Sequence, residues 1–221
     1  MHPSLCKRQL FPARCRLPLL SALVINLLVY YASKLIAGSW PHHILETGLD
    51  RAIPLLPWTV TVYIGAFLFW GAGYIMAVRP DRENAWRFLA ADAVGKLVCF
   101  AFFLILPTTV IRPDIPAGAP FGWVLGLIYA ADTPDNLFPS IHCFNSYLCW
   151  AGVRGRRDVP ALWRVFSLIT TLAVAVSTLT TKQHLFADAL AGCILAELCW
   201  QLAGRTGIGS LYGRIWKQTA E

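Results

Sequence analysis

Apolar residues follow one another in long runs along this chain, and polar residues gather in the short stretches between them. Runs of about 20 residues with few charges are typical of transmembrane helices. Six runs fit that description, and they cover residues 17–37, 55–78, 88–111, 139–153, 162–181 and 184–203, the fourth being the shortest. The pattern therefore predicts an all-α fold, an integral membrane bundle of six helices that forms a single domain over residues 1–221.

The composition supports this prediction. The chain is 57% hydrophobic and 14% charged, which is far more apolar than a soluble domain. The first run is longer than the apolar segment of about 7–15 residues in a cleaved signal peptide, so we expect a retained membrane anchor. The seven cysteines are an odd number and show no Cys-x-x-Cys spacing. They are predicted to be small packing residues, not a zinc site or a disulfide framework.

The distribution of basic residues predicts the orientation. A net charge of +7 would favour a nucleic-acid partner in a soluble protein, but 14 of the 19 lysines and arginines lie in the two terminal segments and in or beside the second and fourth connections. The remaining connections hold only Arg51, Arg112 and Lys182. Because cytoplasmic loops are rich in lysine and arginine, both termini are predicted to be cytoplasmic, and no nucleic-acid partner is expected.

The first, third and fifth connections are predicted to face outward. Residues 38–54 contain the adjacent histidines His42 and His43 and are expected to include a short interfacial helix. A metal site there is disfavoured, because no suitably spaced carboxylate accompanies the histidines. Residues 112–138 include an apolar stretch at 121–131. That stretch is too short to cross a hydrocarbon core of about 30 Å, so we expect it to lie in the interface.

Two histidines begin apolar runs on this outward side. His142 begins the fourth run and His184 begins the sixth, with Asp188 four residues later and therefore on the same helix face. A carboxylate bound to one imidazole nitrogen leaves the other nitrogen free to attack. The simpler alternative is a histidine that binds backbone or water at a helix start. A carboxylate about 6 Å deeper is costly without a partner, which favours the pair.

Further residues at the same membrane level suit phosphate chemistry. Arg112 ends the third run, and its forked guanidinium matches a phosphate, although alone it could be an interfacial snorkelling arginine. Ser140 stands where a helix needs a cap, and free N–H groups at such a start attract anions. His142, with an ordinary pKa of about 6.5, suits proton transfer to a leaving oxygen. Arg112 and Ser140 are therefore predicted to bind substrate phosphate.

These residues resemble the type 2 phosphatidic acid phosphatase (PAP2) superfamily. Its motifs are Lys-x6-Arg-Pro, Pro-Ser-x-His and Ser-Arg-x5-His-x3-Asp on a six-helix membrane core. The second motif is present at 139–142, and the third aligns with Ser177, His184 and Asp188. The resemblance implies that His184 is the nucleophile, that Asp188 orients it and that His142 is the general acid.

The resemblance covers 112–192 well, within a motif-bearing core of about 88–203, but two motif cations are missing. Ile105 stands at the position of the first-motif lysine and Thr178 at that of the third-motif arginine. Lys182 is predicted to replace them in binding phosphate, the alternative being an ordinary interfacial lysine. Such loosened motifs resemble the branch of inositol phosphorylceramide synthases, which transfer a phospho-headgroup between lipids.

The expected function is that of a membrane-embedded lipid phosphate phosphatase or phosphotransferase at the outer leaflet of the plasma membrane, working through a phosphohistidine. No carboxylate cluster suggests a metal, and no cofactor is expected. One alternative is a phospho-headgroup transferase; another is a non-catalytic lipid-binding or carrier protein. Deeper in the bundle, Asp92, Lys96 and Glu197 are expected to form a structural ion network.

Overall fold

The computed structural model describes residues 13–218, and these residues are almost entirely helical. Five helices are long and apolar enough to cross a membrane. They are α1 (Arg16–Ala37, preceded by the 3-10 turn Ala13–Cys15), α3 (Val60–Val78, preceded by the 3-10 turn Pro57–Thr59), α4 (Arg82–Ile105), α7 (Ala161–Thr180) and α8 (Phe186–Arg205). The predicted all-α class is confirmed.

The predicted fourth span is much shorter than the others. It forms α6 (Ile141–Ala151), whose 11 residues extend only about 16 Å at 1.5 Å per residue. The helix begins after Ser140 and gives way to a turn at Gly152. Phe144, Leu148 and Cys149 on it are fully buried, because α6 packs between neighbouring helices. A helix too short to cross the hydrocarbon core is tolerated within a membrane protein where other helices surround it, because its terminal backbone groups are then not exposed to lipid.

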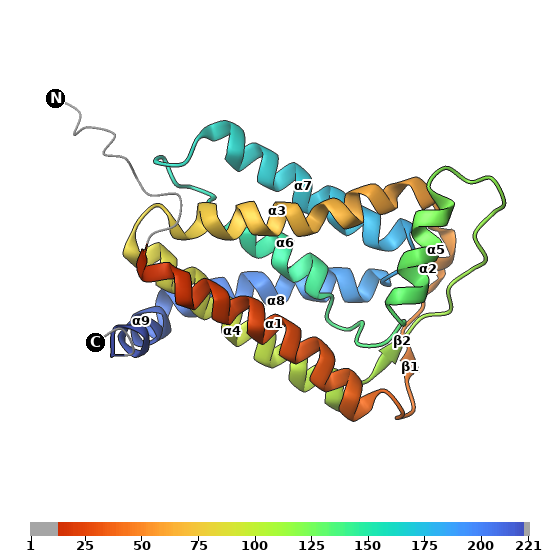
Figure 1. Ribbon diagram of the computed structural model, residues 1–221, viewed down its shortest axis with the longest axis horizontal. Helices are drawn as coiled ribbons and strands as arrows, with labels where there is room; N and C mark the ends of the chain where they lie inside the picture. The colour runs from red at the N-terminus through yellow and green to blue at the C-terminus, as the bar shows by residue number, and fades with distance from the viewer. Residues whose placement is uncertain (1–12, 219–221) are drawn as a thin grey trace.

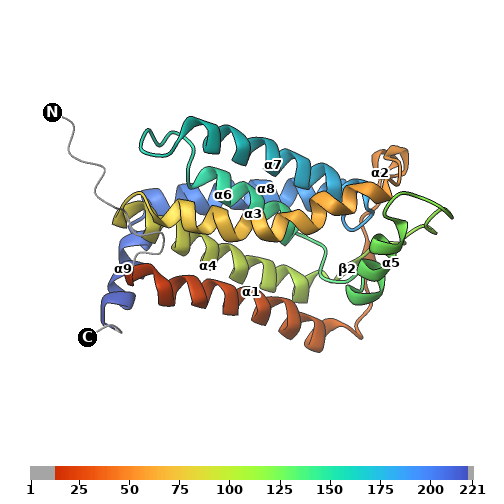
Figure 2. The same ribbon diagram turned by 45° about the horizontal axis from the view of Figure 1, so that its top comes forward.

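The six helices lie side by side along the long axis of the molecule (Figures 1 and 2). Helix α8 contacts both α4 and α6, α1 packs on α4, and α3 packs on α6 and α7. At one end lie α2 (Gly48–Ala52) and α5 (Gly122–Ala131), and at the opposite end α9 (Ile208–Gln218) crosses the bundle (Figure 1). Helix α2 is the short helix expected in the first outward connection.

A two-residue parallel pairing joins two of the predicted outward connections. Strand β1 (His43–Ile44) lies beside β2 (Thr108–Thr109), so the segment after α1 is tied to the segment after α4. Two-residue strands have too little periodicity to be seen in the sequence, and this pairing was not expected. It fixes both loops at the end of the bundle that carries the histidines.

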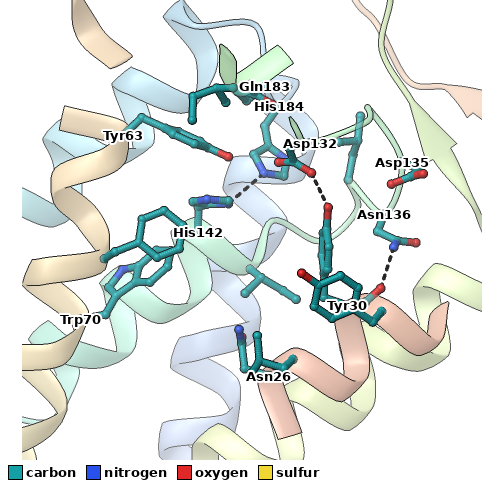
Figure 3. Close-up of a pocket in the computed structure, with 16 residues that line it drawn as sticks. Asn26, Tyr30, Tyr63, Trp70, Asp132, Asp135, Asn136, His142, Gln183 and His184 are labelled. Atoms are coloured by element: carbon teal, nitrogen blue, oxygen red, sulfur yellow. Dashed lines mark hydrogen bonds between the residues drawn. The ribbon is translucent and has the colours of Figure 1, made fainter. Parts of the chain in front are cut away.

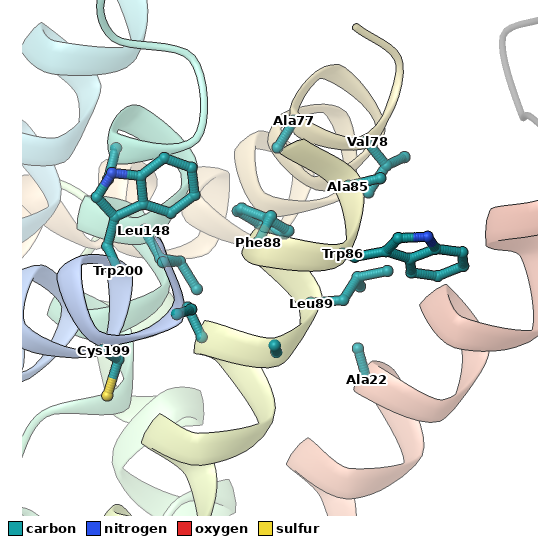
Figure 4. Close-up of a cluster of buried hydrophobic side chains, with 14 of the residues drawn as sticks. Ala22, Ala77, Val78, Ala85, Trp86, Phe88, Leu89, Leu148, Cys199 and Trp200 are labelled. Carbon is teal, nitrogen blue, oxygen red and sulfur yellow. The ribbon is translucent and has the colours of Figure 1, made fainter. Parts of the chain in front are cut away.

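Small residues alternate with large rings in the core at the α9 end (Figure 4). Ala77 and Ala85 pack there with Phe88, Leu148 and Trp200, all of them buried. Lipid tails are as apolar as a protein core, so helix association in a membrane depends on close packing, which small residues allow.

The deeper charges form two clusters rather than one. Asp92 and Lys96 are fully buried on α4 with Nζ 3.3 Å from the carboxylate, and Lys96 also bonds to Asn145 of α6. Glu197 instead pairs with Arg154 at 2.6 Å. The expected pairing of Asp92 with Lys96 is confirmed, whereas the prediction that Glu197 shares their network is wrong: Arg154, just beyond the end of α6, lies close enough to neutralise it.

Candidate active site

Two imidazole rings from different parts of the chain meet near one end of the bundle. His142 lies in the first turn of α6 and His184 in the turn before α8, with His184 Nε2 3.4 Å from His142 Nδ1 (Figure 3). The His142 ring also stacks on Tyr63 of α3 at 4.5 Å between centroids. Three helices thus hold His142 against His184.

The two histidines meet because the starts of α6 and α8 are joined. The Ser140 amide donates to the Asp188 carbonyl at 3.0 Å, and the Ser140 hydroxyl caps α6 by accepting from the Cys143 amide. Gly192 makes this approach possible: a Cβ there would lie 2.4 Å from the Ser140 carbonyl oxygen. Ser140 is fully buried and lines neither neighbouring cavity, so its predicted contact with phosphate has no counterpart in this arrangement.

A tight turn after α7 fixes the backbone of His184. The amides of Gln183 and His184 both donate to the Thr178 carbonyl, at 3.0 and 3.1 Å. Lys182 adopts a left-handed conformation with φ of 54° to close this turn. Thr178, at the position of the expected motif arginine, therefore supports the turn through its backbone and brings no charge to the site.

Asp188 lies behind His184, as its spacing predicted. Its Oδ2 accepts from the Leu185 amide at 2.8 Å and lies 3.7 Å from His184 Nδ1, which is beyond ordinary hydrogen-bond length. Asp188 Oδ1 and His184 Nδ1 are both buried and have no hydrogen-bond partner within residues 13–218. The Asp188 carboxylate is therefore near His184 Nδ1 but does not hydrogen-bond to it in this conformation.

A cavity of about 290 Å³ opens beside the histidines (Figure 3). Its polar wall comes from α1, α3, the segment before α6 and the turn before α8, and it comprises Asn26, Tyr30, Tyr63, Asp132, Asp135, Asn136 and Gln183. Its apolar wall includes Leu27 and Phe67. A cavity with one polar and one apolar side suits an amphiphilic ligand.

The cavity has an acidic lining. Asp132 accepts a 2.5 Å hydrogen bond from the Tyr30 hydroxyl, and Asp135 lies 3.7 Å from the ammonium of Lys34. Among the described residues that line it, none is a lysine or an arginine. Asp132 and Asp135 were not predicted as site residues, although their place directly before the Pro-Ser-Ile-His segment was a signal that they lie near it.

The guanidinium of Arg112 is hydrogen-bonded to groups of the protein. It donates to the carbonyls of Tyr129 and Asp132, at 3.2 and 2.7 Å, and to the side chain of Gln183 at 2.5 Å. Burial lowers the pKa of Arg112, and the nearby Asp132 opposes that change. An arginine remains charged in any case. Arg112 does not line the histidine cavity, but it hydrogen-bonds two residues that do, Asp132 and Gln183.

Lys182 does not line the cavity beside His142; it lines a second cavity of about 370 Å³. Its Nζ donates to the carbonyls of Asp50 and Ile53, at 2.8 and 2.6 Å. Arg51 and His184 also line this second cavity. His184 therefore lines both the acidic cavity shared with His142 and a second cavity whose lining holds two basic and two acidic residues: Arg51, Lys182, Glu46 and Asp50.

Asp50 anchors the start of α8. Its carboxylate accepts from the Phe186 amide at 2.6 Å and from the Thr47 amide and hydroxyl at 2.8 and 2.6 Å. Burial raises the pKa of Asp50, but these hydrogen bonds outweigh it and the pKa lies below its ordinary value. The sequence showed Thr47 three residues before Asp50, which is a local capping pattern. It gave no sign that the same carboxylate would cap a helix beginning at residue 186.

The structure shows no candidate metal centre within residues 13–218, where no three His, Cys, Asp or Glu side chains lie close enough to share an ion. His42 hydrogen-bonds the Trp40 carbonyl at 2.7 Å. The described part of the chain thus adds nothing in favour of a metal at His42 and His43.

Comparisons with models of protein families, with curated proteins and with solved structures found no match to this chain. The resemblance to the PAP2 superfamily therefore rests on the motif residues alone.

Proposed function

We propose that this protein is a PAP2-type phosphoester hydrolase or phosphotransferase, embedded in the plasma membrane with six spans and acting on lipid phosphates at the outer leaflet. The observation that supports it best is the meeting of His142 and His184, 3.4 Å apart at a cavity, with the Asp188 carboxylate behind His184. Two imidazoles and a carboxylate in this order are the groups required for nucleophilic transfer with general acid catalysis.

The two nitrogens of His184 have different neighbours, which supports a different role for each of them. Asp188 beside Nδ1 favours a proton on Nδ1 and leaves the lone pair on Nε2. Nε2 attacks phosphorus, the N–P bond forms and the bond from phosphorus to the lipid alcohol breaks. Protonated His142 gives its proton to that departing oxygen. Water or a second alcohol then attacks phosphorus, the P–N bond breaks, and His142 takes the proton released by the attacking oxygen.

The mechanism requires the two rings to separate. Attacking and leaving atoms lie on opposite sides of phosphorus in phosphoryl transfer, so the phosphoryl group must stand between His184 and His142. A separation of 3.4 Å leaves no room for it. His142 is fixed on one face by Tyr63, whereas His184 lies in a turn, so we expect His184 to make the larger movement.

A phospho-headgroup transferase is a second candidate, favoured by the cavity lining. Carboxylates and amide groups suit the hydroxyls of an acceptor alcohol better than they suit a phosphate dianion. Asn26 Oδ1, Gln183 Nε2 and His142 Nε2 are buried at this cavity without a hydrogen-bond partner within the described chain. A hydroxyl-bearing acceptor could satisfy both the donors and the acceptors among them.

Thin-layer analysis of labelled lipids tests the proposal. The purified protein is incubated with radiolabelled phosphatidic acid and with headgroup-labelled phosphodiester lipids, with and without acceptor alcohols. Release of labelled phosphate supports hydrolysis, and a new labelled lipid that appears only with an alcohol supports transfer. The His184→Ala variant should give neither. Lipid binding without turnover of any substrate would contradict the proposal and favour a non-catalytic carrier.

A further inference from the structure

A third cavity, of about 490 Å³, lies at the end of the bundle opposite to the histidines, where α9 crosses α4 and α8 (Figure 1). Three basic side chains line it: Arg82 and Arg87 from the first turns of α4, and Arg214 from α9. Glu83 is the single acidic residue among the described residues of the lining. The cavity therefore carries a net positive charge.

Arg87 is held in place by the protein, while the other two arginines are free to bind a ligand. Arg87 Nε donates to the Trp200 carbonyl at 3.1 Å, and the guanidinium carbon lies 3.8 Å from the centre of the Trp200 ring. Arg82 and Arg214 are exposed and make no hydrogen bond or ion pair with any residue in the range 13–218. The cavity thus has one cation in a fixed position, Arg87, and two whose side chains can adjust to a ligand, Arg82 and Arg214.

Small residues and a tryptophan form the rest of the wall. A Cβ at Gly204 would lie 2.4 Å from the guanidinium carbon of Arg87, and one at Gly213 would lie 2.5 Å from the Trp86 ring. Larger residues at these positions would fill the space. Trp86 belongs to this lining, and its buried indole N–H has no acceptor within the described residues.

The position of α9 places the cavity at the depth of lipid headgroups. Leu211 and Ile215 on α9 are exposed, at 50% and 53%, and the same helix carries Arg214. A helix with exposed apolar and basic residues, lying across the ends of membrane spans, is typical of the membrane interface. An anionic headgroup at this level would meet all three arginines.

We propose that this cavity binds the phosphate-bearing headgroup of an anionic phospholipid, in the leaflet opposite to the histidine site. Basic pockets between membrane helices are suited to such headgroups, and guanidinium groups bind phosphate oxygens in a fork geometry. The acyl chains would lie against the exposed apolar side chains of α9. This proposal is independent of any catalytic activity of the histidines.

Native mass spectrometry of the full chain in neutral detergent tests the proposal, because such a micelle has no anionic surface. Phosphatidylglycerol and phosphatidylcholine serve as probes. The wild type should retain one phosphatidylglycerol and little phosphatidylcholine. Arg82→Gln and Arg214→Gln should each weaken phosphatidylglycerol binding about fivefold, and the double variant about 25-fold, because each cation contributes about that factor near an anionic lipid. Arg87 is left unchanged because it also packs on Trp200.

Arg157→Gln provides the matched control. Arg157 is an exposed arginine in the loop between α6 and α7 and lies outside the cavity lining, so its loss should leave lipid retention unchanged. An equal loss in this control would show diffuse attraction and overturn the proposal, as would equal retention of phosphatidylcholine. Displacement of the lipid by equimolar glycerol phosphate would show a site for free anions instead. If the double variant fails to fold, the two single variants decide.

Discussion

At the residue scale, His184 has a different neighbour at each ring nitrogen. Asp188 lies 3.7 Å from Nδ1 and His142 lies 3.4 Å from Nε2. A nucleophile needs a free lone pair on the nitrogen that faces the substrate, whereas a general acid needs a proton there. The carboxylate behind His184 favours the first state for this ring. Loss of His142 and loss of His184 should therefore affect turnover differently.

His184→Ala should abolish turnover, and His142→Ala should slow it by roughly 10²–10⁴-fold, the usual contribution of a general acid. A p-nitrophenyl phosphoester has a leaving group that needs no proton, so it should largely restore the His142→Ala rate and leave His184→Ala inactive. Steady-state rates with alkyl and p-nitrophenyl substrates measure both effects. Equal rescue of the two variants would remove the distinction between nucleophile and acid.

The direction of the Arg112 and Lys182 side chains could not be predicted from the sequence. The sequence predicted that Arg112 and Lys182 lie beyond the ends of two helices on the same side as the histidines, and the structure has both at the histidine end. Their side chains bond to backbone carbonyls, those of Tyr129 and Asp132 for Arg112 and those of Asp50 and Ile53 for Lys182. The direction of these side chains depends on the path of the loops that carry them, and loop sequences have no hydrophobic periodicity from which that path could be predicted. Whether either cation binds phosphate stays a prediction.

Lys182→Ala should lower kcat/KM at least tenfold, and Lys182→Arg should retain more activity. Loss of one electrostatic contact to a transition state costs about 10²–10³ in rate, and few other cations lie near His184. Alanine bears the same left-handed backbone penalty as lysine, so the comparison reports the side chain. Rates and melting temperatures are measured together.

Arg157→Ala is the control for this experiment, since Arg157 is exposed near the opposite end. Lys34 is unsuitable because its ammonium lies 3.7 Å from Asp135 at the histidine cavity. A melting temperature that falls while kcat/KM stays constant would make Lys182 a purely structural residue, tying the turn before α8 to Asp50 and Ile53.

At the element scale, long apolar runs were sufficient to predict five of the helices, and short elements were not predictable. Helix α6 is shorter than its apolar run because the backbone of Ser140 is extended and the chain turns at Gly152. Helix α9 was missed because its apolar residues are few and are spaced among polar ones, so no apolar run marks it. The β1–β2 pairing depends on tertiary contact alone.

The approach of α8 to α6 is the element contact on which the histidine pair depends. Gly192→Ala would place a Cβ 2.4 Å from the Ser140 carbonyl oxygen, so the two helices must move apart. Overpacking of this kind costs about 1–3 kcal/mol. We expect a lower melting temperature and a loss of most activity, because His142 and His184 move with their helices.

Gly71→Ala is the matched control, because a Cβ at this position on α3 meets nothing within 4 Å. Alanine there should be neutral or should stabilise the helix by up to about 1 kcal/mol. Full activity of Gly192→Ala at an unchanged melting temperature would show that the helices accommodate the methyl group, and the argument from close approach would fail.

The Asp50 carboxylate links α2 to the start of α8, and this link should depend on pH. Its pKa is lowered in the folded chain, so its contribution to stability is present above the ordinary pKa near 3.8 and is lost as pH falls below it. Asp50→Asn should cost about 1.5–3 kcal/mol at neutral pH, as expected for hydrogen bonds to a charged group. The difference in melting temperature between the two proteins should be constant from pH 7 to about pH 5 and should shrink as pH falls below the ordinary pKa near 3.8.

Glu46→Gln is the control for that series. Glu46 is exposed and pairs with Arg51 at 3.2 Å, and exposed ion pairs contribute little to stability. A difference between wild type and Asp50→Asn that persists unchanged at pH 3 would show that the carboxylate charge plays no part.

At the scale of the whole molecule, most of the described basic residues lie at the end of the bundle opposite to His142 and His184. Arg82, Arg154 and Arg214 belong to the end where α9 lies, and His184 belongs to the end with α2 and α5 (Figure 1). The structure contains no membrane, so the direction of insertion comes from the charge bias alone. Because the long helices run between the two ends of the bundle, the charge bias predicts the membrane side of both ends: the α9 end is cytoplasmic and the histidine end faces outward.

Single cysteines introduced into a cysteine-free background test the orientation with an impermeant thiol reagent. Positions 40 and 118 lie at the histidine end and should be labelled from outside intact cells; positions 83 and 157 lie at the α9 end and should be labelled only after permeabilisation. All four residues are exposed, so a negative result reports the membrane and not burial. Labelling of 83 and 157 in intact cells, with 40 and 118 protected, would invert the molecule and place the histidine site on the cytoplasmic side. Labelling of position 157 but not of position 83 in intact cells would place the two on different sides of the membrane and would mean that α6 does not complete a sixth span.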